Sequence, residues 1–311
     1  MLTLLTVVLS AYIRLAEMGI GCEPWPSCYG VLNVELEKKG ITVLTADGAD
    51  MAHRGARLAH RYIASTLGLF IIVIFAVSLQ QRDNRATTLL VPAAVLGLTI
   101  FLSLLGYYTP TRSNPLVTMG NLCGGMGLLA LLWWMLQRST EVVTQHAAPH
   151  LRHMALLALG LVSLQIFLGG WSSANYASTA CPDLLSCNAS WLSASDYADA
   201  YSMKRQVALD ANGQVIADSS LGTMSMTHRG IALLTAAYLA FMVRKLKSHS
   251  ELRGTAIALS IFSVGLLGVG ISMVWFQLPL FLLALHNALA AGLLLSGVNL
   301  WHRLTPQPAG R

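Results

Sequence analysis

Apolar residues run along this chain in eight long stretches, which short polar or charged segments separate. The stretches cover approximately residues 1–20, 59–80, 87–107, 116–137, 153–173, 223–243, 255–275 and 280–301. A helix of about 20 apolar residues crosses the roughly 30 Å hydrocarbon core of a bilayer, because each residue adds about 1.5 Å. The pattern therefore predicts an all-α membrane protein with eight transmembrane helices.

The segments between these stretches differ in length and in charge. The segments rich in Arg and Lys are short: 81–86, 138–152, 244–254 and the tail after Trp301. The two long segments, 21–58 and 174–222, contain most of the acidic residues. Short basic loops stay on the cytoplasmic side of a membrane. We therefore expect both termini in the cytoplasm and both long loops on the outer side.

The composition agrees with a membrane protein. Of the 311 residues, 55% are hydrophobic and 11% are charged, whereas soluble domains carry about 25% charged residues. The net charge of +6 fits membrane topology, and no basic patch interleaved with aromatic residues indicates nucleic-acid binding. The first stretch begins at Met1 without a basic segment, so we expect no cleavable signal peptide. A start further upstream would explain its short beginning.

Several markers occur twice in the same order, which indicates an internal repeat. The equivalent positions are Cys22 and Cys181, Cys28 and Cys187, His60 and His228, and Asn121 and His286, at offsets of 159, 159, 168 and 165 residues. Each of the two histidines near the start of a stretch is followed by Arg. We therefore expect two tandem, pseudo-symmetric four-helix bundles, residues 1–137 and 153–311, joined by a cytoplasmic linker, 138–152.

Four of the five cysteines form two C-x5-C pairs in the predicted outer loops. A periplasm-like space favours disulfides. Zinc is disfavoured, because neither loop offers a further Cys or His at ligand spacing. A redox role for one pair stays open, whereas the repetition of the pair weighs against two unrelated structural thiols. Cys123 lies inside an apolar stretch and is interpreted as a small packing residue.

The nine histidines differ in where the predicted helices place them. Those in or beside cytoplasmic loops, which we expect to be solvated, are His146, His150, His153, His249 and His302. His53 lies in the first outer loop without a clear role. His60, His228 and His286 remain, each on an even-numbered predicted helix near its outer end, where ligand-capable side chains in a membrane indicate function.

His228 and His286 are predicted to lie at similar depth, because their helices run in the same direction. Two imidazoles on opposite sides of a flat macrocycle are one way in which proteins hold haem. Arg61 and Arg229, each next to a histidine, would then pair with haem propionates. The alternative is an interhelical hydrogen bond for each His and snorkelling for each Arg. In the first half Asn121 replaces the second imidazole, so the repeat offers no second bis-His site there.

The motifs RLAEMGIGCEPWPSCYG, HRYIASTLG, FLGGWSSANYASTACPDLLSC and MTHRGIALL resemble the haem A synthase family over essentially the whole chain. The family resides in bacterial inner membranes or mitochondria and oxidises the C8 methyl of haem O to the formyl of haem A for terminal oxidases. The resemblance implies a haem b cofactor on His228 and His286, and haem O handled in the N-terminal half. It also implies that the family's loop cysteines match the two C-x5-C pairs, and that Gln165 fits the family pattern.

Two positions depart from that pattern. Arg57 stands where the family has a Glu, and Asn121 stands where it has a second N-terminal His. A carboxylate in an apolar pocket can act as a base, whereas a guanidinium remains protonated. A haem on His60 would be at most five-coordinate, and the open position would favour substrate exchange or oxygen chemistry.

Three hypotheses follow. The first is a haem A synthase, with haem O as substrate and with haem O synthase, an electron-transfer partner, oxidase assembly factors and the bilayer as partners. The second is a catalytically degenerate paralogue, acting as a haem-binding membrane cytochrome or as a haem carrier for oxidase assembly. The third is a transporter, which is weakest because helices broken by Gly or Pro at mid-membrane are not prominent. A homo-oligomer stays open.

Overall fold

The structure is a computed structural model that describes residues 1–17, 47–80, 86–108, 115–139, 149–187, 194–205, 207, 216 and 218–305. Within these ranges the chain is helical and contains no strand. The N-terminal half contributes α1 (Leu2–Glu17), α3 (Asp47–Gln80), α4 (Ala86–Tyr108) and α5 (Pro115–Ser139). The C-terminal half contributes α6 (Pro149–Ala174), α8 (Ser219–Leu246), α9 (Arg253–Trp275) and α10 (Leu280–Leu304). Three short helices are η1 (Ala177–Thr179), α7 (Ala194–Ala200) and η2 (Ser250–Leu252).

Seven of the described helices are long and apolar enough to cross a membrane, and the apolar segment Leu2–Leu15 of α1 is an eighth, shorter one. This confirms the all-α membrane architecture predicted from the apolar stretches. One boundary differs: α3 begins at Asp47, not near residue 59, so His53 lies in a helix and not in a loop. The preceding segment DGADMAHRGARLAH is too polar for the apolar pattern, yet it contains no proline to end a helix.

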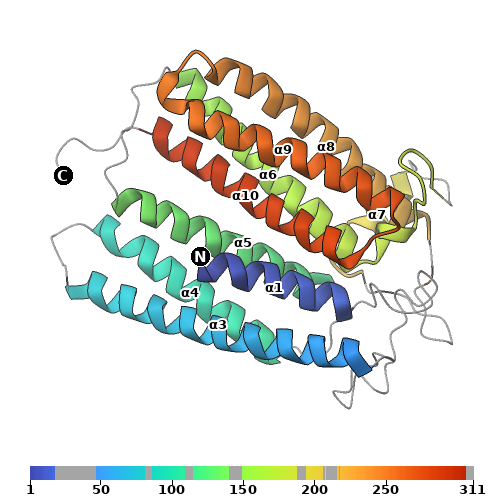
Figure 1. Cartoon of the computed structure of the whole chain (residues 1–311), viewed down its shortest axis with the longest axis horizontal. Helices are drawn as coiled ribbons and strands as arrows, with labels where there is room; N and C mark the ends of the chain where they lie inside the picture. Colours follow the sequence, from blue (N-terminus) through green and yellow to red (C-terminus); the bar gives the residue numbers. More distant parts are fainter. Residues whose placement is uncertain are drawn as a thin grey trace.

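The eight apolar helices lie in two groups, one from each half of the chain (Figure 1), and the contacts close each group into a ring with the same internal order. In the N-terminal half α1 packs on α3, α3 on α4, α4 on α5, and α5 returns to α1. In the C-terminal half α6, α8, α9 and α10 close a ring in the equivalent order. Between the halves, α5 packs on α10 while α1 packs on α10 and α5 on α6. Exchanging each helix of one half with its equivalent in the other half leaves this set of contacts unchanged, which is the pattern of a pseudo-two-fold repeat. The division into the bundles 1–137 and 153–311 with the linker 138–152 stays a prediction.

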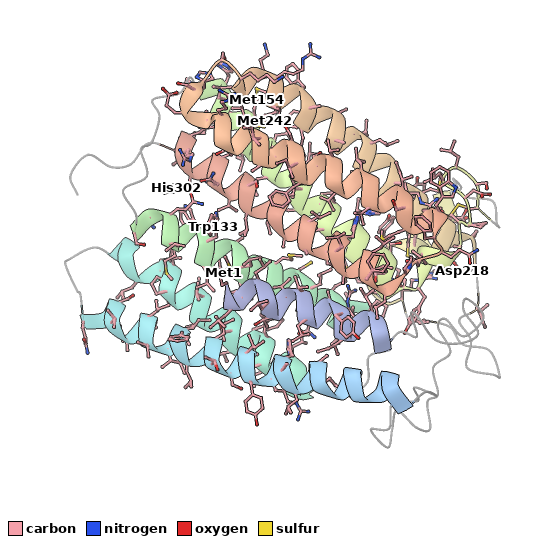
Figure 2. The ribbon with its side chains drawn as sticks, in the orientation of Figure 1. Met1, Trp133, Met154, Asp218, Met242 and His302 are labelled. Carbon is pink, nitrogen blue, oxygen red and sulfur yellow. A yellow bond between two sulfur atoms is a disulfide. The ribbon has the colours of Figure 1, made fainter. Side chains whose placement is uncertain are left out.

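The largest apolar cluster lies in the C-terminal half and extends into α1 and α5 through Val7 and Met126. Helix α10 is the most enclosed of the seven long spans, with 44% of its span buried, whereas 6% of the span Ser250–Trp275 is buried. His302, near the end of α10, is only 2% exposed (Figure 2), so the expectation of a solvated side chain was wrong. The His302 ring forms a hydrogen bond with the backbone of Gln137 in α5, which places it in the junction between the halves.

Candidate functional site

A cavity of about 1170 Å³ lies between α6, α8, α9 and α10 of the C-terminal half, and residues of α1 and α5 complete its wall. Its walls are mostly apolar side chains and glycines. His228 from α8 and His286 from α10 both line it. The structure thus places in one cavity the two histidines that were predicted to lie at similar depth because their helices run in the same direction. Its volume exceeds the range of about 300–1,000 Å³ typical of pockets for small molecules, so the cavity suits a large apolar ligand.

The position of His228 depends on how α8 begins. Asp218 is the N-cap residue, and its carboxylate accepts a hydrogen bond from the backbone N–H of Leu221 at 3.1 Å. The carboxylate also accepts from the Ser220 hydroxyl and, at 2.7 Å, from Arg205. Burial by itself raises the pKa of Asp218, but these hydrogen bonds and the Arg205 charge outweigh it and lower the pKa. The charged cap therefore fixes the start of α8, the helix that carries His228 into the bundle.

The two imidazoles have different surroundings. The Gln165 amide nitrogen lies 3.3 Å from His228 Nδ1 and donates to the His228 carbonyl oxygen at 3.1 Å. Gly169, one turn after Gln165, approaches so closely that a Cβ there would lie 2.8 Å from His228 Cε1. His286 Nδ1 is buried and has no hydrogen-bond partner among the described residues, and a Cβ on Gly270 would lie 3.7 Å from His286 Cε1, an ordinary contact distance. The missing side chain of Gly169 thus lets the His228 ring pack directly against α6.

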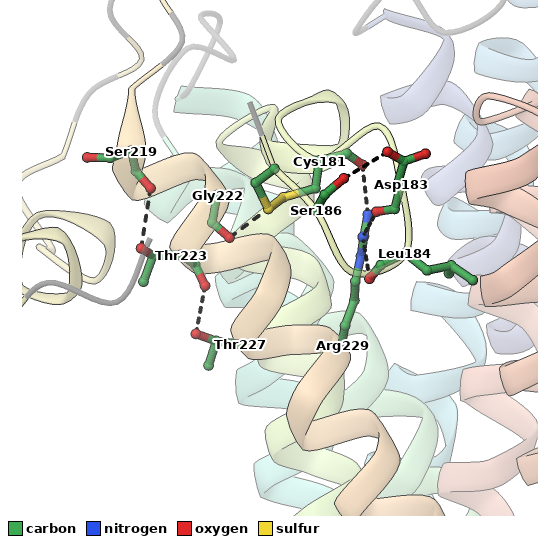
Figure 3. The surroundings of a disulfide bond; sticks show 10 residues. Cys181, Asp183, Leu184, Ser186, Ser219, Gly222, Thr223, Thr227 and Arg229 are labelled. Atoms are coloured by element: carbon green, nitrogen blue, oxygen red, sulfur yellow. Dashed lines mark hydrogen bonds between the residues drawn. A yellow bond between two sulfur atoms is a disulfide. The ribbon is translucent and has the colours of Figure 1, made fainter. Parts of the chain in front are cut away.

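A disulfide joins Cys181 and Cys187 (Figure 3) and closes a loop whose residues line one end of the cavity. We call residues 181–187 the disulfide loop. Arg229, next to His228, donates to the carbonyl oxygens of Cys181 and Leu184 at 3.1 Å each, and also to that of Asp183. The guanidinium therefore ties this loop to α8 (Figure 3). This confirms the expected pairing of these two cysteines, whereas the pair Cys22 and Cys28 lies outside the described residues.

In the N-terminal half, Arg57 and His60 lie on one face of α3. Both are half-buried, and the buried residues Leu67 and Ile71 follow His60 at intervals of 7 and 11 residues, which places them on the same helix face. His60 therefore points toward the interior of the N-terminal ring. Arg61 is exposed and lies on another face.

Asn121 occupies the facing helix α5. It is exposed, but it lies two turns before Leu128, which is buried among the N-terminal residues Ile71 and Val95. Among the described residues, neither Asn121 nor His60 lines the C-terminal cavity. The residues predicted for haem O and for haem b are therefore in separate halves of the molecule.

One cavity residue was missed by the sequence analysis. Arg14, on α1 of the N-terminal half, lines the C-terminal cavity, and its Nη1 donates to Ser173 Oγ on α6 at 3.2 Å. A signal existed, because an Arg within the first apolar stretch is costly and points to function. The sequence pattern does not predict that α1 packs against the C-terminal half.

Comparison with known proteins agrees with this architecture. Residues 1–298 match the COX15-CtaA family, described as cytochrome oxidase assembly proteins. The chain belongs to this family. It is also 32% identical over 317 aligned positions to a protein of Shewanella oneidensis named heme A synthase, covering 97% of this chain and 94% of that relative. The resemblance inferred from the motifs is thereby confirmed.

Proposed function

We propose that this chain is a haem A synthase, which oxidises the C8 methyl of haem O to a formyl group. The observation that carries the proposal is the C-terminal cavity, lined by His228 and His286, in a chain that is similar over 97% of its length to a heme A synthase. Conversion of a methyl to a formyl group removes four electrons and adds one oxygen atom. Such a reaction needs a redox cofactor and a separate place for the substrate.

The cavity residues fit haem b as the resident cofactor. His228 and His286 would hold the haem iron, with Gln165 beside Nδ1 of His228 to orient that ring. The buried Nδ1 of His286 lacks a partner, and the approach of Gly169 leaves His228 space that a Cβ would fill. When bound, haem b supplies one-electron redox chemistry. The residues themselves hold the ligand, exclude water through apolar walls and keep both imidazoles in place.

The substrate half is the N-terminal ring, with His60 facing its interior. His60 would hold haem O, and Asn121 on the facing helix would border the opposite side. Arg61, exposed on α3, would pair with a propionate of the substrate. Arg57 lies one turn before His60 on the same face and keeps its proton, so it would bind an anionic group of the substrate and not act as a base.

A second candidate function rests on Arg57 and Asn121. If the N-terminal half binds haem without oxidising it, the chain is a membrane cytochrome or a haem carrier for oxidase assembly. The two readings predict different products. Co-expression with a haem O synthase, followed by acid-acetone extraction and chromatography of the haems, separates them: haem A or its hydroxymethyl precursor supports the synthase, and haem O alone refutes it.

Matched variants sharpen the experiment. His60→Ala removes the imidazole that faces the N-terminal ring and should abolish haem A formation while the C-terminal haem spectrum remains. His153→Ala is the control: it changes an exposed histidine near the start of α6 and should leave both haem A formation and the C-terminal haem spectrum unchanged. Arg57→Glu together with Asn121→His restores the family pattern and should maintain or raise the yield of haem A.

The proposal places the protein in a bacterial inner membrane with both termini in the cytoplasm. The short basic loops support this orientation. Haem O synthase, an electron-transfer partner and oxidase assembly factors would be its partners. A phosphatase fused after residue 305, active only outside the cytoplasm, should be inactive, and a fusion within residues 188–193 should be active.

A further inference from the structure

The wall of the C-terminal cavity is closed on one side and open on another. Met126 of α5, Val162 of α6 and Leu293 of α10 line the cavity and are each at most 5% exposed. Leu233 of α8 and Ile271 of α9 line it too, yet they are 63% and 42% exposed. Lining the cavity does not by itself expose a side chain, as the first three residues show. The cavity is therefore open to the surroundings beside Leu233 and Ile271.

The two exposed residues come from neighbouring helices. Helix α8 packs on α9, and both residues lie in segments long and apolar enough to cross a membrane. The span Ser250–Trp275, which contains α9, is the least buried of the seven described spans. Gly230 of α8 also lines the cavity and is exposed, and no atom lies within 4 Å of a Cβ built there. We call Gly230, Leu233 and Ile271 the portal residues.

The disulfide loop borders the portal at one end. Arg229 lies one turn before Leu233 on the same face of α8, and it donates to the Leu184 carbonyl oxygen at 3.1 Å. Leu184 and Leu185 both line the cavity, and Leu185 is 83% exposed. The disulfide and the hydrogen bonds from Arg229 hold this loop on α8. One border of the portal is thus a fixed loop with an apolar tip.

The exposed side chains at the portal suit a ligand that arrives from lipid. Leu185, Leu233 and Ile271 are apolar, and in a membrane-spanning helix a side chain that protein does not cover contacts lipid. Lipid chains are about as apolar as leucine, so a flat apolar ligand can move from one to the other without exposing its surface to water. The same side chains disfavour the passage of water and ions, because these would lose hydrogen bonds there.

We propose that the tetrapyrrole enters and leaves the C-terminal cavity sideways, from the lipid bilayer, through the portal between α8 and α9. This inference rests on the proposed function, because it takes the ligand to be the haem of that cavity. The back wall from α5, α6 and α10 stays closed, so the ligand reaches His228 and His286 from the side of α8 and α9.

The test measures how fast haem leaves the protein. The full-length protein, with the haem that it acquires in the cell, is reconstituted in lipid vesicles, and excess apomyoglobin takes up the released haem, which is followed by its Soret absorbance. Leu233→Trp and Ile271→Trp narrow the portal, whereas Leu233→Ala and Ile271→Ala widen it. Val264→Trp and Val264→Ala are the matched controls, because Val264 of α9 is 69% exposed but is not among the described residues that line the cavity.

We expect both Trp variants to slow haem release about tenfold, because the ligand must push a larger side chain aside. Both Ala variants should release haem faster than the wild type, and both Val264 variants should match it. Effects in opposite directions identify a passage, since a protein that is merely destabilised loses haem faster whichever residue replaces the native one. Equal rates in all variants, or faster release from the Trp variants, would overturn the inference.

A spin label tests the lipid route without relying on haem. A nitroxide attached to Leu233→Cys should be more accessible to oxygen, which dissolves in lipid, than to a water-soluble nickel complex. The reverse order would mean that the opening faces water, and the inference would be wrong. If the Trp variants do not fold, unchanged release from both Ala variants is decisive against it. Wild-type protein that purifies without haem would instead refute the proposed cofactor, while the label still reports on the opening.

Discussion

Replacing Gly169 by alanine tests whether His228 is held in place by the close approach of α6. A Cβ at this position would lie 2.8 Å from Cε1, 3.3 Å from Nε2 and 3.4 Å from Nδ1 of the His228 ring. The whole edge of the imidazole therefore meets the new methyl group. The ring is also in contact with Gln165, whose amide nitrogen lies 3.3 Å from Nδ1, so it is restrained on that side as well.

The size of the effect follows from the contact distance. Non-bonded carbon atoms rest at about 3.5–4.0 Å, so the His228 ring must move by roughly 0.7 Å or more to accept the methyl group. Overpacking of this kind costs about 1–3 kcal/mol. If this overpacking raises the free energy of the haem-bound protein, haem retention drops by about tenfold or more, since each 1.4 kcal/mol corresponds to a factor of ten.

Gly160→Ala on the same helix is the matched control, because nothing lies within 4 Å of a Cβ there. Both variants gain the same helix propensity, about 1 kcal/mol for Ala over Gly, so their difference isolates the contact with His228. The assay is the reduced-minus-oxidised haem spectrum per mole of purified protein, measured beside the thermal unfolding midpoint. Gly160→Ala should keep the wild-type spectrum, whereas Gly169→Ala should lose haem or show an altered ligand field.

A Gly169→Ala protein with full haem content and an unchanged spectrum would refute the reasoning. It would mean that His228 is not an axial ligand, or that α6 and α8 separate without cost. If Gly160→Ala loses haem to the same extent, the cause is a general effect of alanine in α6, and the claim that the Gly169–His228 contact holds the ring is refuted.

Three further predictions concern the surroundings of the cavity. The pKa of Asp218 is lowered from its ordinary value of 3.8, so its charge stabilises the fold above that value, and this stabilisation is lost as the pH falls through the lower folded-state pKa. Asp218→Asn keeps the N-cap and should cost about 0.5 kcal/mol of folding free energy at neutral pH. It should also make unfolding in acid, followed by circular dichroism, less dependent on pH. Gln165→Leu removes the amide beside Nδ1 of His228 and should shift the haem midpoint potential with little loss of α-helix, whereas an unchanged potential would exclude a role in orienting the ring. Arg229→Gln removes the donors to the disulfide loop, so the loop should be cut faster by protease added from outside than in the wild type, and equal rates would show that the disulfide alone holds it.

The membrane architecture was predictable because it depends on the length and spacing of apolar stretches. A bilayer imposes nearly the same length on each spanning helix, so local composition is sufficient. The pairing of His228 with His286 was predictable for a related reason: alternate spanning helices run in the same direction, so positions near the start of each lie at similar depth. Both inferences use the sequence pattern together with a constraint that the membrane supplies.

Features that depend on contacts between helices were not predictable. His302 follows an apolar stretch and precedes a polar tail, so its pattern is that of a solvated residue, yet the junction between α10 and α5 buries it. Arg14 reaches the C-terminal cavity only because α1 packs on α10. The early start of α3 depends on residues that are helical without being apolar. Each case requires knowledge of which helices meet.

The enclosure of α10 has a consequence for how the protein is made. This helix carries His286, contacts α1, α5, α6 and α9, and comes after the other described helices in the chain, so the ribosome makes it after them. Until it inserts between the halves, the nascent chain has an open apolar groove where the cavity wall will be, and it lacks one of the two imidazoles. We therefore expect cofactor loading to follow the insertion of α10, and chains that stop before Leu280 to be recognised by membrane proteases as unfinished.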